Sequence, residues 1–537
     1  MDGLLAAVGP VKAAIIAVLL ALLVRYFQNA RSNYAAPRKT FSIHPLAPSF
    51  ISGIYAAYQL GINETEFLLS LQKQYGAAVY LPFPIAQHFI LSDKLVRRIY
   101  SGAYNSQLSF IPIRKRMSTT IFGMADSITA LDNAQLDKHI FPVHAKGMTK
   151  ARLLNAVDRF DKSVKDTVTH ELHNWKGDKT VDIVDWTYTL MFKASLAALF
   201  GDQLDIPLDR FMKCFKDFDT AFPLLASEQI PTFLQRHFPP VVARGVRSRD
   251  WLNVRFGKWA RETGCAGLDD GDVVKAMATE GIRLGFSDYD NGSGILGDFW
   301  ALLANNPFAV SWIVIYLIQA DKQIYRDVMA EIDSVDLSNT PPAQADLPLL
   351  TSVIFETLRL KSSSFSIRSA PPTNASVAHL RADEDDQNGI FIQPGEKLTC
   401  ITRVGHLDPE VWGGSARQWD GRRFYDDPET RYDPDTPKKS KRIPEVRAFG
   451  GGVSICEGRN LAQAELKAFL VHVLQSFEFS LTPATIEQTQ NVKNLDTLVS
   501  TEGVQMMAPK AAPGRPGLGV LQLDGAMYVR MSKRHKE

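Results

Sequence analysis

One cysteine, Cys456, lies between a glycine-rich turn and a predicted helix, in the sequence FGGGVSICEGR at residues 449–459. Three consecutive glycines at 450–452 let the backbone turn tightly and come close to a flat macrocycle. The N–H groups at the start of the following helix can donate to the sulfur, which lowers the pKa of the thiol and tunes a bound metal. The segment therefore suits an axial thiolate ligand to heme iron. The alternative is a buried structural cysteine in an ordinary turn.

A second motif lies upstream, where Glu356 and Arg359 occur among apolar residues that repeat with a helical period. Residues three apart are neighbours on one helix face, so these two side chains can form a partly buried, bidentate ion pair. The alternative is a solvated salt bridge on the protein surface, as in many helices.

The loop resembles the cysteine-ligand loop of the cytochrome P450 family, in which a thiolate pushes electron density onto iron to favour O–O cleavage. The resemblance assigns heme b binding to Phe449, Gly452, Cys456 and Gly458, with Cys456 as the iron ligand. It extends over nearly the whole chain. It implies a mainly α fold with a minor β portion near the N-terminus, and a heme held between a long central helix and the Cys456 loop.

The Glu-x-x-Arg pair also occupies the position, relative to the cysteine, that it has in this family. The family network has an arginine as its third member, and the segment WDGRRF at residues 419–424 resembles the one that supplies it. Either Arg422 or Arg423 would close the network. Arg423 is favoured, because Phe424 fits the family's terminal aromatic residue.

Composition agrees with one large catalytic unit. The chain has 537 residues, and no linker, low-complexity tract or fixed repeat divides it. A net charge of +2 gives no reason to expect nucleic acid as a partner. The four cysteines are widely spaced, unlike a disulfide framework or a zinc site, which indicates a reducing, cytosol-facing compartment. We expect a catalytic domain over residues 41–537.

Residues 1–40 are predicted to form a membrane anchor followed by a basic, proline-containing hinge. The apolar run Ala13–Val24 extends back to Leu4 with interruptions, and so reaches the ~20 residues that a membrane helix needs. Basic residues follow the run directly, and the positive-inside rule then keeps the remainder of the chain in the cytosol. This pattern predicts a single-pass protein of the endoplasmic reticulum membrane. A cleaved secretory peptide is the alternative.

Partners for the heme propionates depart from the family pattern. Residues 121–126 resemble the loop that caps the distal heme pocket, and many members place Trp-x-x-x-Arg just beyond it. This chain has Lys138 and His139 there, and either side chain can bind a propionate or belong to a solvated basic face. Ser454 occupies the position two before the cysteine where arginine or histidine usually serves.

The apolar segment Leu296–Ile318 predicts a central helix through the protein interior. Most family members carry an acid–alcohol pair there that delivers protons, but Pro307 and Phe308 occupy those two positions. Pro307 predicts a kink, because it removes a helical N–H. The pattern resembles the branch that contains cholesterol 7α-hydroxylase and prostacyclin synthase. Asn305 and Asn306 are the candidates for a catalytic role, or else they satisfy the carbonyls that the kink frees.

Those two relatives differ in chemistry, because the first activates dioxygen with electrons from a reductase and the second rearranges a peroxide. A basic stretch at residues 438–447 can dock an acidic NADPH-cytochrome P450 reductase. No flavin or nicotinamide fingerprint is present, so that reductase would be a separate protein. We expect a monooxygenase that hydroxylates a lipophilic terpenoid, steroid-like or polycyclic secondary metabolite. A reductase-independent isomerase and a non-catalytic heme carrier or sensor are the alternatives.

Overall fold

The computed structural model describes residues 39–201, 204, 206–336, 340–371, 377–383, 389–425, 446–491, 495–500 and 503–535. The predicted anchor and all of the basic stretch up to residue 445 lie outside the described residues.

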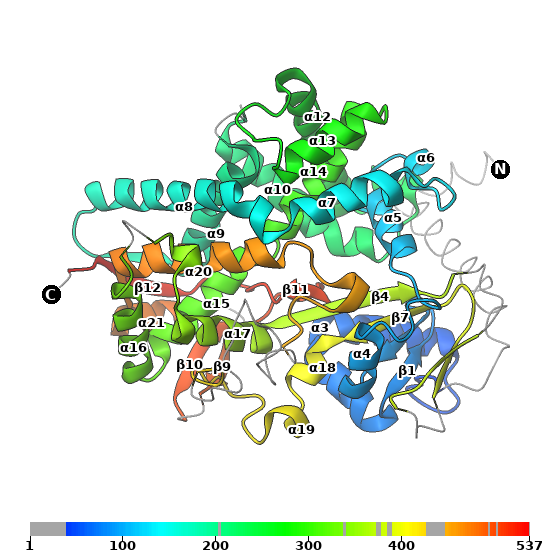
Figure 1. The fold of residues 1–537 in the computed structure, drawn as a ribbon. Helices are drawn as coiled ribbons and strands as arrows, with labels where there is room; N and C mark the ends of the chain where they lie inside the picture. The colour runs from blue at the N-terminus through cyan, green and yellow to red at the C-terminus, as the bar shows by residue number, and fades with distance from the viewer. Residues whose placement is uncertain are drawn as a thin grey trace, which may run out of the picture.

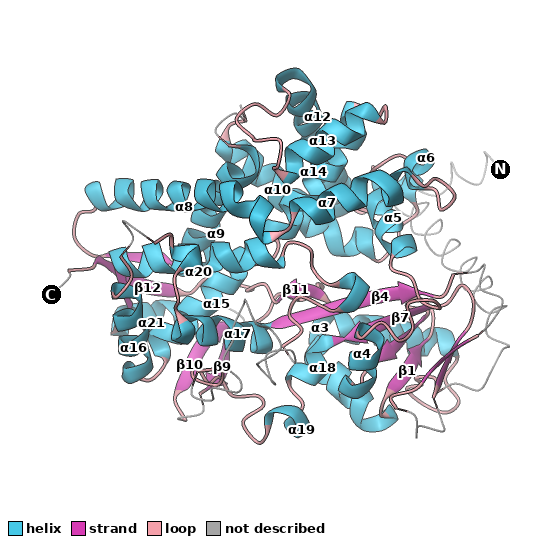
Figure 2. Cartoon of the chain, in the orientation of Figure 1, coloured by secondary structure: helices cyan, strands magenta, loops and turns pink. Residues whose placement is uncertain are grey.

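The described chain is mainly helical, as predicted, and Figures 1 and 2 show the arrangement. The longer helices are α3 (Ser49–Tyr75), α4 (Asp93–Tyr100), α5 (Ile111–Thr120), α8 (Lys150–His173), α9 (Ile183–Phe200), α10 (Leu208–Ala226), α12 (Pro240–Thr263), α13 (Val273–Arg283), α14 (Asp288–Leu303), α15 (Asn306–Gln319), α16 (Lys322–Asp333), α17 (Pro348–Lys361), α20 (Arg459–Ser476) and α21 (Pro483–Gln490). The shorter ones are α6 (Asp126–Thr129), η1 (Leu136–Ile140), α7 (Phe141–Gly147), α11 (Thr232–Gln235), η2 (Pro342–Gln344), α18 (Thr402–His406), α19 (Pro409–Trp412) and η4 (Gly452–Ser454).

Several helices begin where a side chain accepts a hydrogen bond from the first turn. Ser92, Asp182, Ser287 and Asp321 do so for α4, α9, α14 and α16, and Thr482 forms a capping box at α21. Each cap satisfies N–H groups that have no partner within the helix. These short polar residues therefore set where the helices start.

The β portion draws strands from both ends of the sequence. The strands are β1 (Ala78–Leu81), β2 (Gln87–Ile90), β3 (Lys179–Asp182), β4 (Ser362–Ser369), β5 (Ala378–Leu380), β6 (Ile390–Ile392), β7 (Lys397–Ile401), β8 (Phe477–Ser480), β9 (Leu495–Val499), β10 (Gln505–Pro509), β11 (Leu518–Val520) and β12 (Tyr528–Lys533).

The largest sheet has the order β1-β2-β7-β4-β11. Strand β2 pairs with β7 in parallel, with His88 opposite Leu398, and the other neighbours are antiparallel. The sequence predicted strands near the N-terminus only. The sheet also contains β4, β7 and β11, which come from beyond residue 360. Smaller sheets are β3-β12-β8, β10-β9 and β5-β6.

Helices α14 and α15 form the predicted central helix, and they meet at a kink. Asn305 has non-helical backbone angles (φ −121°, ψ −56°), and Pro307 lies in the first turn of α15, where its missing N–H costs nothing. The helix begins at Asp288, earlier than predicted. This run is apolar enough to cross a membrane, but 78% of its most apolar window is buried, as in the core helix of a globular protein.

Two hydrophobic clusters flank the kink. One packs α14 against α10 and α12, in the upper part of Figure 1. The other packs α15 against α9, α17 and α20, in the lower part. The central helix therefore connects both halves of the core, and the Cys456 loop leads into α20 beside it.

Candidate active site

The ligand loop, residues 449–458, precedes helix α20 and packs on helix α4. Gly450 and Gly452 adopt φ angles of +69° and +58°, which glycine tolerates without strain. A Cβ atom at Gly452 would lie 2.7 Å from the carbonyl oxygen of Tyr100. The Cys456 N–H donates to the Phe449 carbonyl at 2.8 Å and closes the turn. The glycines thus allow both the turn and the close approach to α4.

Cys456 is exposed at the end of this loop. The surrounding chain removes water from the thiol and raises its pKa, whereas the N–H groups of Gly458 and Arg459 and the charge of Arg459 favour the thiolate. Coordination to a metal ion removes the thiol proton outright. The residue is therefore exposed while its thiol is partly shielded from water, and the sulfur meets the N–H groups at the start of α20, as suits a metal ligand.

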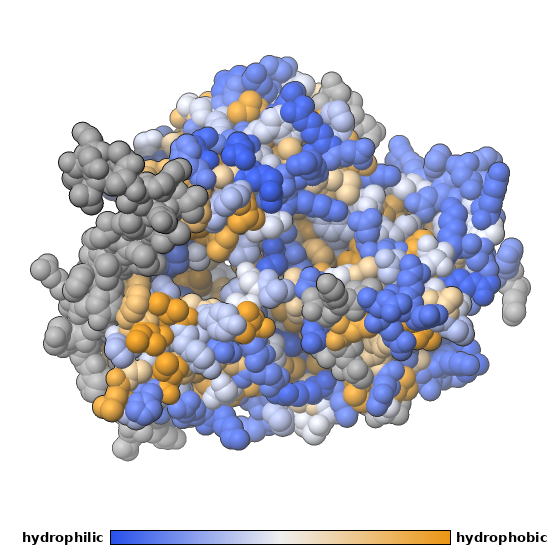
Figure 3. All heavy atoms as spheres, turned by 180° about the vertical axis from the view of Figure 1, so that it is seen from behind, coloured by the Kyte–Doolittle hydropathy of each residue, from blue (hydrophilic) through white to orange (hydrophobic). Residues whose placement is uncertain are grey.

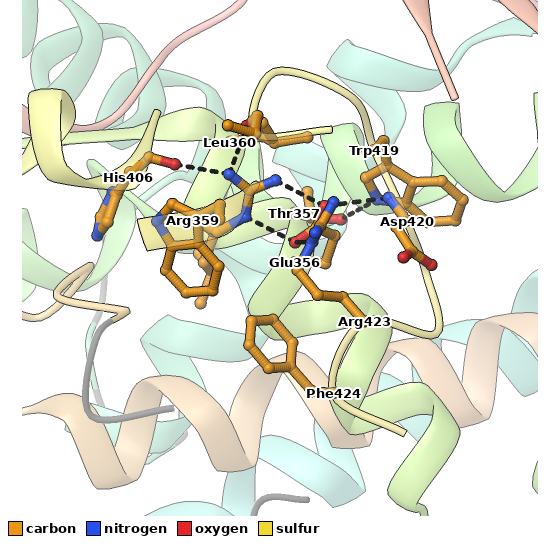
Figure 4. A network of polar contacts seen from close by, with 12 residues as sticks. Glu356, Thr357, Arg359, Leu360, His406, Trp419, Asp420, Arg423 and Phe424 are labelled. Atoms are coloured by element: carbon orange, nitrogen blue, oxygen red, sulfur yellow. Dashed lines mark hydrogen bonds and ion pairs between the residues drawn. The ribbon is translucent and has the colours of Figure 1, made fainter. Parts of the chain in front are cut away.

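Figure 4 shows Glu356, on α17, at the centre of a buried ion network. Arg359 binds it through Nε and Nη2 at 2.8 Å each. Arg423 adds a bond from Nε to Glu356 Oε2 at 3.0 Å, and the Asp420 N–H donates to Oε1 at 3.0 Å. Arg422 instead pairs with a carboxylate on α16. One fully buried carboxylate therefore balances two arginines.

The network reaches the ligand loop through His406, a residue that the sequence did not single out. Arg359 Nη1 donates to the His406 carbonyl at 2.6 Å, and the Arg447 N–H donates to His406 Nε2 at 2.9 Å. Burial, together with the positive charges of Arg403 and Arg447, holds the pKa of His406 well below 6.5, so the ring is neutral and can accept. Arg447 also pairs with Asp93 of α4. The ion network thus fixes the approach to the loop.

Arg368, on strand β4, supplies a positive charge beside Ser454. Its guanidinium is fully buried, donates from Nη2 to the Gly451 carbonyl and to Ser454 Oγ at 3.2 Å each, and leaves Nε without a partner. A buried cation with an unused N–H next to the ligand loop fits an anionic group such as a heme propionate. The sequence did not predict this role for Arg368. Its only indication was a single arginine among the small and apolar residues of a strand.

A second charged cluster surrounds Glu457, the residue after the cysteine. Arg114 of α5 binds it through Nη1 and Nη2 at 3.1 Å each, and His144 of α7 contacts it through Nδ1. His144 Nε2 lies 2.9 Å from Asp298 Oδ1 on α14. Burial lowers the pKa of His144, but the two carboxylates outweigh burial and raise it from 6.5 to about 9. The cluster joins three helices to the ligand loop.

The two basic candidates of the sequence lie elsewhere. Lys138 and His139 belong to the π-helical turn η1, where Lys138 is exposed and His139 contacts two charged residues of α13. The His139 side chain is 42% exposed. The structure brings neither to the ligand loop, and His144, on the next helix, is the basic residue of this region that contacts it.

Both candidate asparagines make contacts at the kink. Asn305 donates from Nδ2 to the Ala301 carbonyl at 3.2 Å, and its Oδ1 accepts from the Val520 N–H at 2.8 Å. Asn306 donates to Glu465 Oε2 on α20 at 2.8 Å, and the side chains of Asn306 and Glu465 are both buried. Burial raises the pKa of Glu465 to about 8, despite this bond. Asn305 therefore connects the kink to β11, and Asn306 connects it to α20.

The otherwise buried central helix has one open side, and aromatic rings border it. The open side carries Gly294, Gly297, Asp298, Ala301, Asn305 and Phe308. Trp300 stacks on Phe222 with ring centroids 3.6 Å apart, and Phe122 meets it edge-on at 6.2 Å. The Trp300 N–H donates to Asp219 at 2.8 Å, and Arg515 pairs with the same carboxylate at 2.9 Å. Phe122 and Phe308 are the half-buried rings on this side, whereas Trp300 and Phe222 are buried and pack against Phe122.

Comparison with known proteins agrees with this geometry. Residues 306–507 match the family model described as Cytochrome P450, and they include the ion network and the ligand loop. The chain is 23% identical to cytochrome P450 7A1 of Oryctolagus cuniculus over 490 residues, which cover 84% of this chain and 89% of the relative. It is 24% identical to 25-hydroxycholesterol 7-alpha-hydroxylase of Rattus norvegicus over 401 residues, 70% and 89% of the two chains.

A shorter similarity, 30% over 181 residues, is to cytochrome P450 monooxygenase hepE of Aspergillus oryzae, and covers 33% of this chain and 31% of the relative. The matched family model, the mainly helical fold and a cysteine loop supported by a buried Glu-Arg-Arg network all lead to one assignment. Residues 306–507 are assigned to the cytochrome P450 family of monooxygenases.

Proposed function

We propose that this enzyme hydroxylates a bulky apolar metabolite, using dioxygen and electrons from a separate NADPH-cytochrome P450 reductase. The observation that carries the substrate class is the apolar open side of the central helix, where the rings of Phe122 and Phe308 are half-buried and the buried Trp300 packs against Phe122. Such a wall favours flat, fused-ring or terpenoid molecules over polar ones. One relative is named for the 7α-hydroxylation of 25-hydroxycholesterol, which belongs to that class.

We infer that heme b is the cofactor and that Cys456 holds its iron. When bound, heme supplies the chemistry that activates dioxygen. Phe449, Gly452 and Gly458 shape the ligand loop, and Arg368 offers its free N–H to a propionate. The network around Glu356 holds the start of the loop in place through His406. These groups position the cofactor and do not contact substrate.

Asn305 and Asn306 are proposed to influence proton supply through the shape of the kink. Their amides bind the Ala301 carbonyl and Glu465, and these bonds hold the helix open at the point where Pro307 ends its regular ladder. An opened turn exposes backbone carbonyls that can order water. In this proposal neither amide transfers a proton itself.

We propose that the catalytic domain lies on the cytosolic side of the endoplasmic reticulum membrane, held by an N-terminal anchor. Figure 3 shows apolar side chains gathered at the lower left of the molecule, in the region of α3. Exposed apolar residues of this region are Ile43, Leu46, Ile51, Ile54, Tyr55, Tyr58 and Ile62. An apolar surface on the segment that follows the proposed anchor in the sequence suits contact with lipid.

The experiment that tests the function combines the purified full chain, in lipid nanodiscs, with NADPH-cytochrome P450 reductase and a panel of sterols and terpenoids. We expect at least one compound to accelerate NADPH oxidation and to appear as a product that is heavier by one oxygen atom. Comparison of metabolites from cells with and without the protein would supply the native compound. The proposal would be contradicted if neither the panel nor lipid extracts of those cells accelerated NADPH oxidation.

A second function, rearrangement of a peroxide without reductase, is favoured by Pro307 and Phe308 in the positions of the usual acid and alcohol. Such a reaction needs no external protons or electrons, so it would not require the acid–alcohol pair. Conversion of a fatty-acid peroxide at full rate without NADPH would support this function instead.

A further inference from the structure

Asp298 differs from the other acids in the described part of the central helix. Asp288 and Asp290 lie in its first turn and bind Arg261 and the Ala125 N–H. Asp298 lies mid-helix on the open side, and its side chain is 12% exposed. Its Oδ1 contacts His144, and its Oδ2 is buried without a hydrogen-bond partner. A buried carboxylate oxygen without a hydrogen bond lowers the stability of the fold, and such an atom in a native protein often has a functional role.

His144 connects this acid to the protein surface. Its Nε2 lies 2.9 Å from Asp298 Oδ1, and its Nδ1 contacts Glu457. The Glu457 and Arg114 side chains are 30% and 26% exposed, so the far end of the cluster meets solvent. With a pKa of about 9, the imidazole is charged at neutral pH and has a proton to give. The charged groups that face it are Asp298, Glu457 and Arg114.

The central helix offers no other acid at this place. Pro307 and Phe308 fill the usual relay positions, and Glu465 is fully buried on the α20 side, where Asn306 binds it. Asp298 and Asn305 lie on the same open side, seven residues apart. This is about 10 Å along the helix axis, which about three ordered waters can bridge.

We propose that His144 and Asp298 form the route by which protons reach the open side of the central helix, in place of the missing acid–alcohol pair. The inference rests on the proposed monooxygenase function. In each transfer the His144 Nε2–H bond breaks and an Asp298 Oδ1–H bond forms. The neutral carboxyl group then passes its proton to water on the open side of the helix, and His144 regains a proton from solvent after a ring flip. One substrate C–H bond, two such protons, two electrons from NADPH and one dioxygen yield one C–OH group and one water.

The first test measures hydrogen peroxide released per NADPH by the full-length holoenzyme with reductase, without added substrate. We expect Asp298→Asn and His144→Gln to raise this ratio at least about 2-fold, because slow protonation favours loss of superoxide, which dismutates to peroxide in solution, over reduction of dioxygen to water. The matched control is Asp161→Asn. Asp161 pairs with His472 at the same 2.9 Å, but between α8 and α20, away from the open side. Ratios in both variants equal to the control would overturn the route.

The second test does not depend on turnover. Nuclear magnetic resonance is recorded on the full chain, labelled with ¹³C at the histidine Cε1 position and held in the diamagnetic ferrous carbon monoxide form. Of the 11 histidine signals, the one that disappears in His144→Gln belongs to His144. We expect it to titrate near pH 9 and to move towards 6.5 in Asp298→Asn. Titration near 6.5 in the unmodified enzyme would overturn the proposal. If the unmodified enzyme consumes no NADPH with reductase, the proposed function fails instead, and the titration still decides whether His144 and Asp298 are coupled.

Discussion

Glu356→Ala is the sharpest test of how the protein holds its ligand loop. The substitution removes the carboxylate that accepts two bonds from Arg359, one from Arg423 and one from the Asp420 N–H. Both Arg359 and Glu356 are fully buried, so two guanidinium groups would remain without a counter-charge. Loss of one partner of a buried pair typically costs about 3–5 kcal/mol. This is a large part of the ~5–15 kcal/mol that stabilises a folded protein.

The cost converts into a measurable shift of the unfolding temperature. With about 2.1 cal/mol/K per residue, a chain of 537 residues has an unfolding entropy of about 1.1 kcal/mol/K, so the midpoint should fall by about 3–5 °C. Calorimetry of the full chain in nanodiscs measures this shift, and the reduced carbon monoxide spectrum measures heme content, which we expect to fall as well.

The control is Glu66→Ala. Glu66 pairs with Arg417 at 3.1 Å, but both side chains are more than half exposed, so the loss should stay below about 1 kcal/mol. Equal midpoints and equal heme content for Glu356→Ala and Glu66→Ala would refute the reasoning that the buried network supports the loop.

Three further predictions concern the ligand, a buried acid and the anchor. Cys456→Ala should abolish the red-shifted Soret band of the reduced carbon monoxide complex, and Cys400→Ala, which removes a buried thiol of β7, should retain it. Burial holds the Glu465 pKa near 8, so its contribution to stability is complete below about pH 4.5 and is lost as pH rises through 8. Glu465→Gln should therefore flatten the decline in unfolding temperature between pH 6 and 9, and an unchanged slope in calorimetry would contradict this. Removal of residues 1–30 should shift the protein towards the soluble fraction with heme bound, whereas a shortened, secreted product of the full chain would show a cleaved signal.

The sequence predicted those parts of the site in which spacing along the chain determines geometry. The pair Glu356 and Arg359 meets because residues three apart share a helix face, and Pro307 produces a kink because its ring removes an N–H. The turn before Cys456 follows from glycines that accept positive φ. In each case the cause lies within a few neighbouring residues.

Contacts between distant segments could not be predicted in this way. Arg114 and His144 contact Glu457, and Asp298 contacts His144, across separations of 343, 313 and 154 residues. Arg368 contacts the ligand loop because β4 lies next to that loop. The sequence of β4, mostly small residues, does not indicate which segment the strand faces. The same limit explains the narrow prediction for the β portion, because pairing of β11 with β4 depends on tertiary packing and on no local pattern.

The bond between Asn305 and the Val520 N–H has a consequence for engineering this enzyme. Gly519, next to Val520, has a φ of +100°, and a Cβ atom there would collide with the Asn305 side chain. The segment near the C-terminus and the bend of the central helix therefore constrain each other's position. A variant library meant to accept a larger substrate should vary residues 518–520 together with the helix, because a change on one side alone would be resisted by the other.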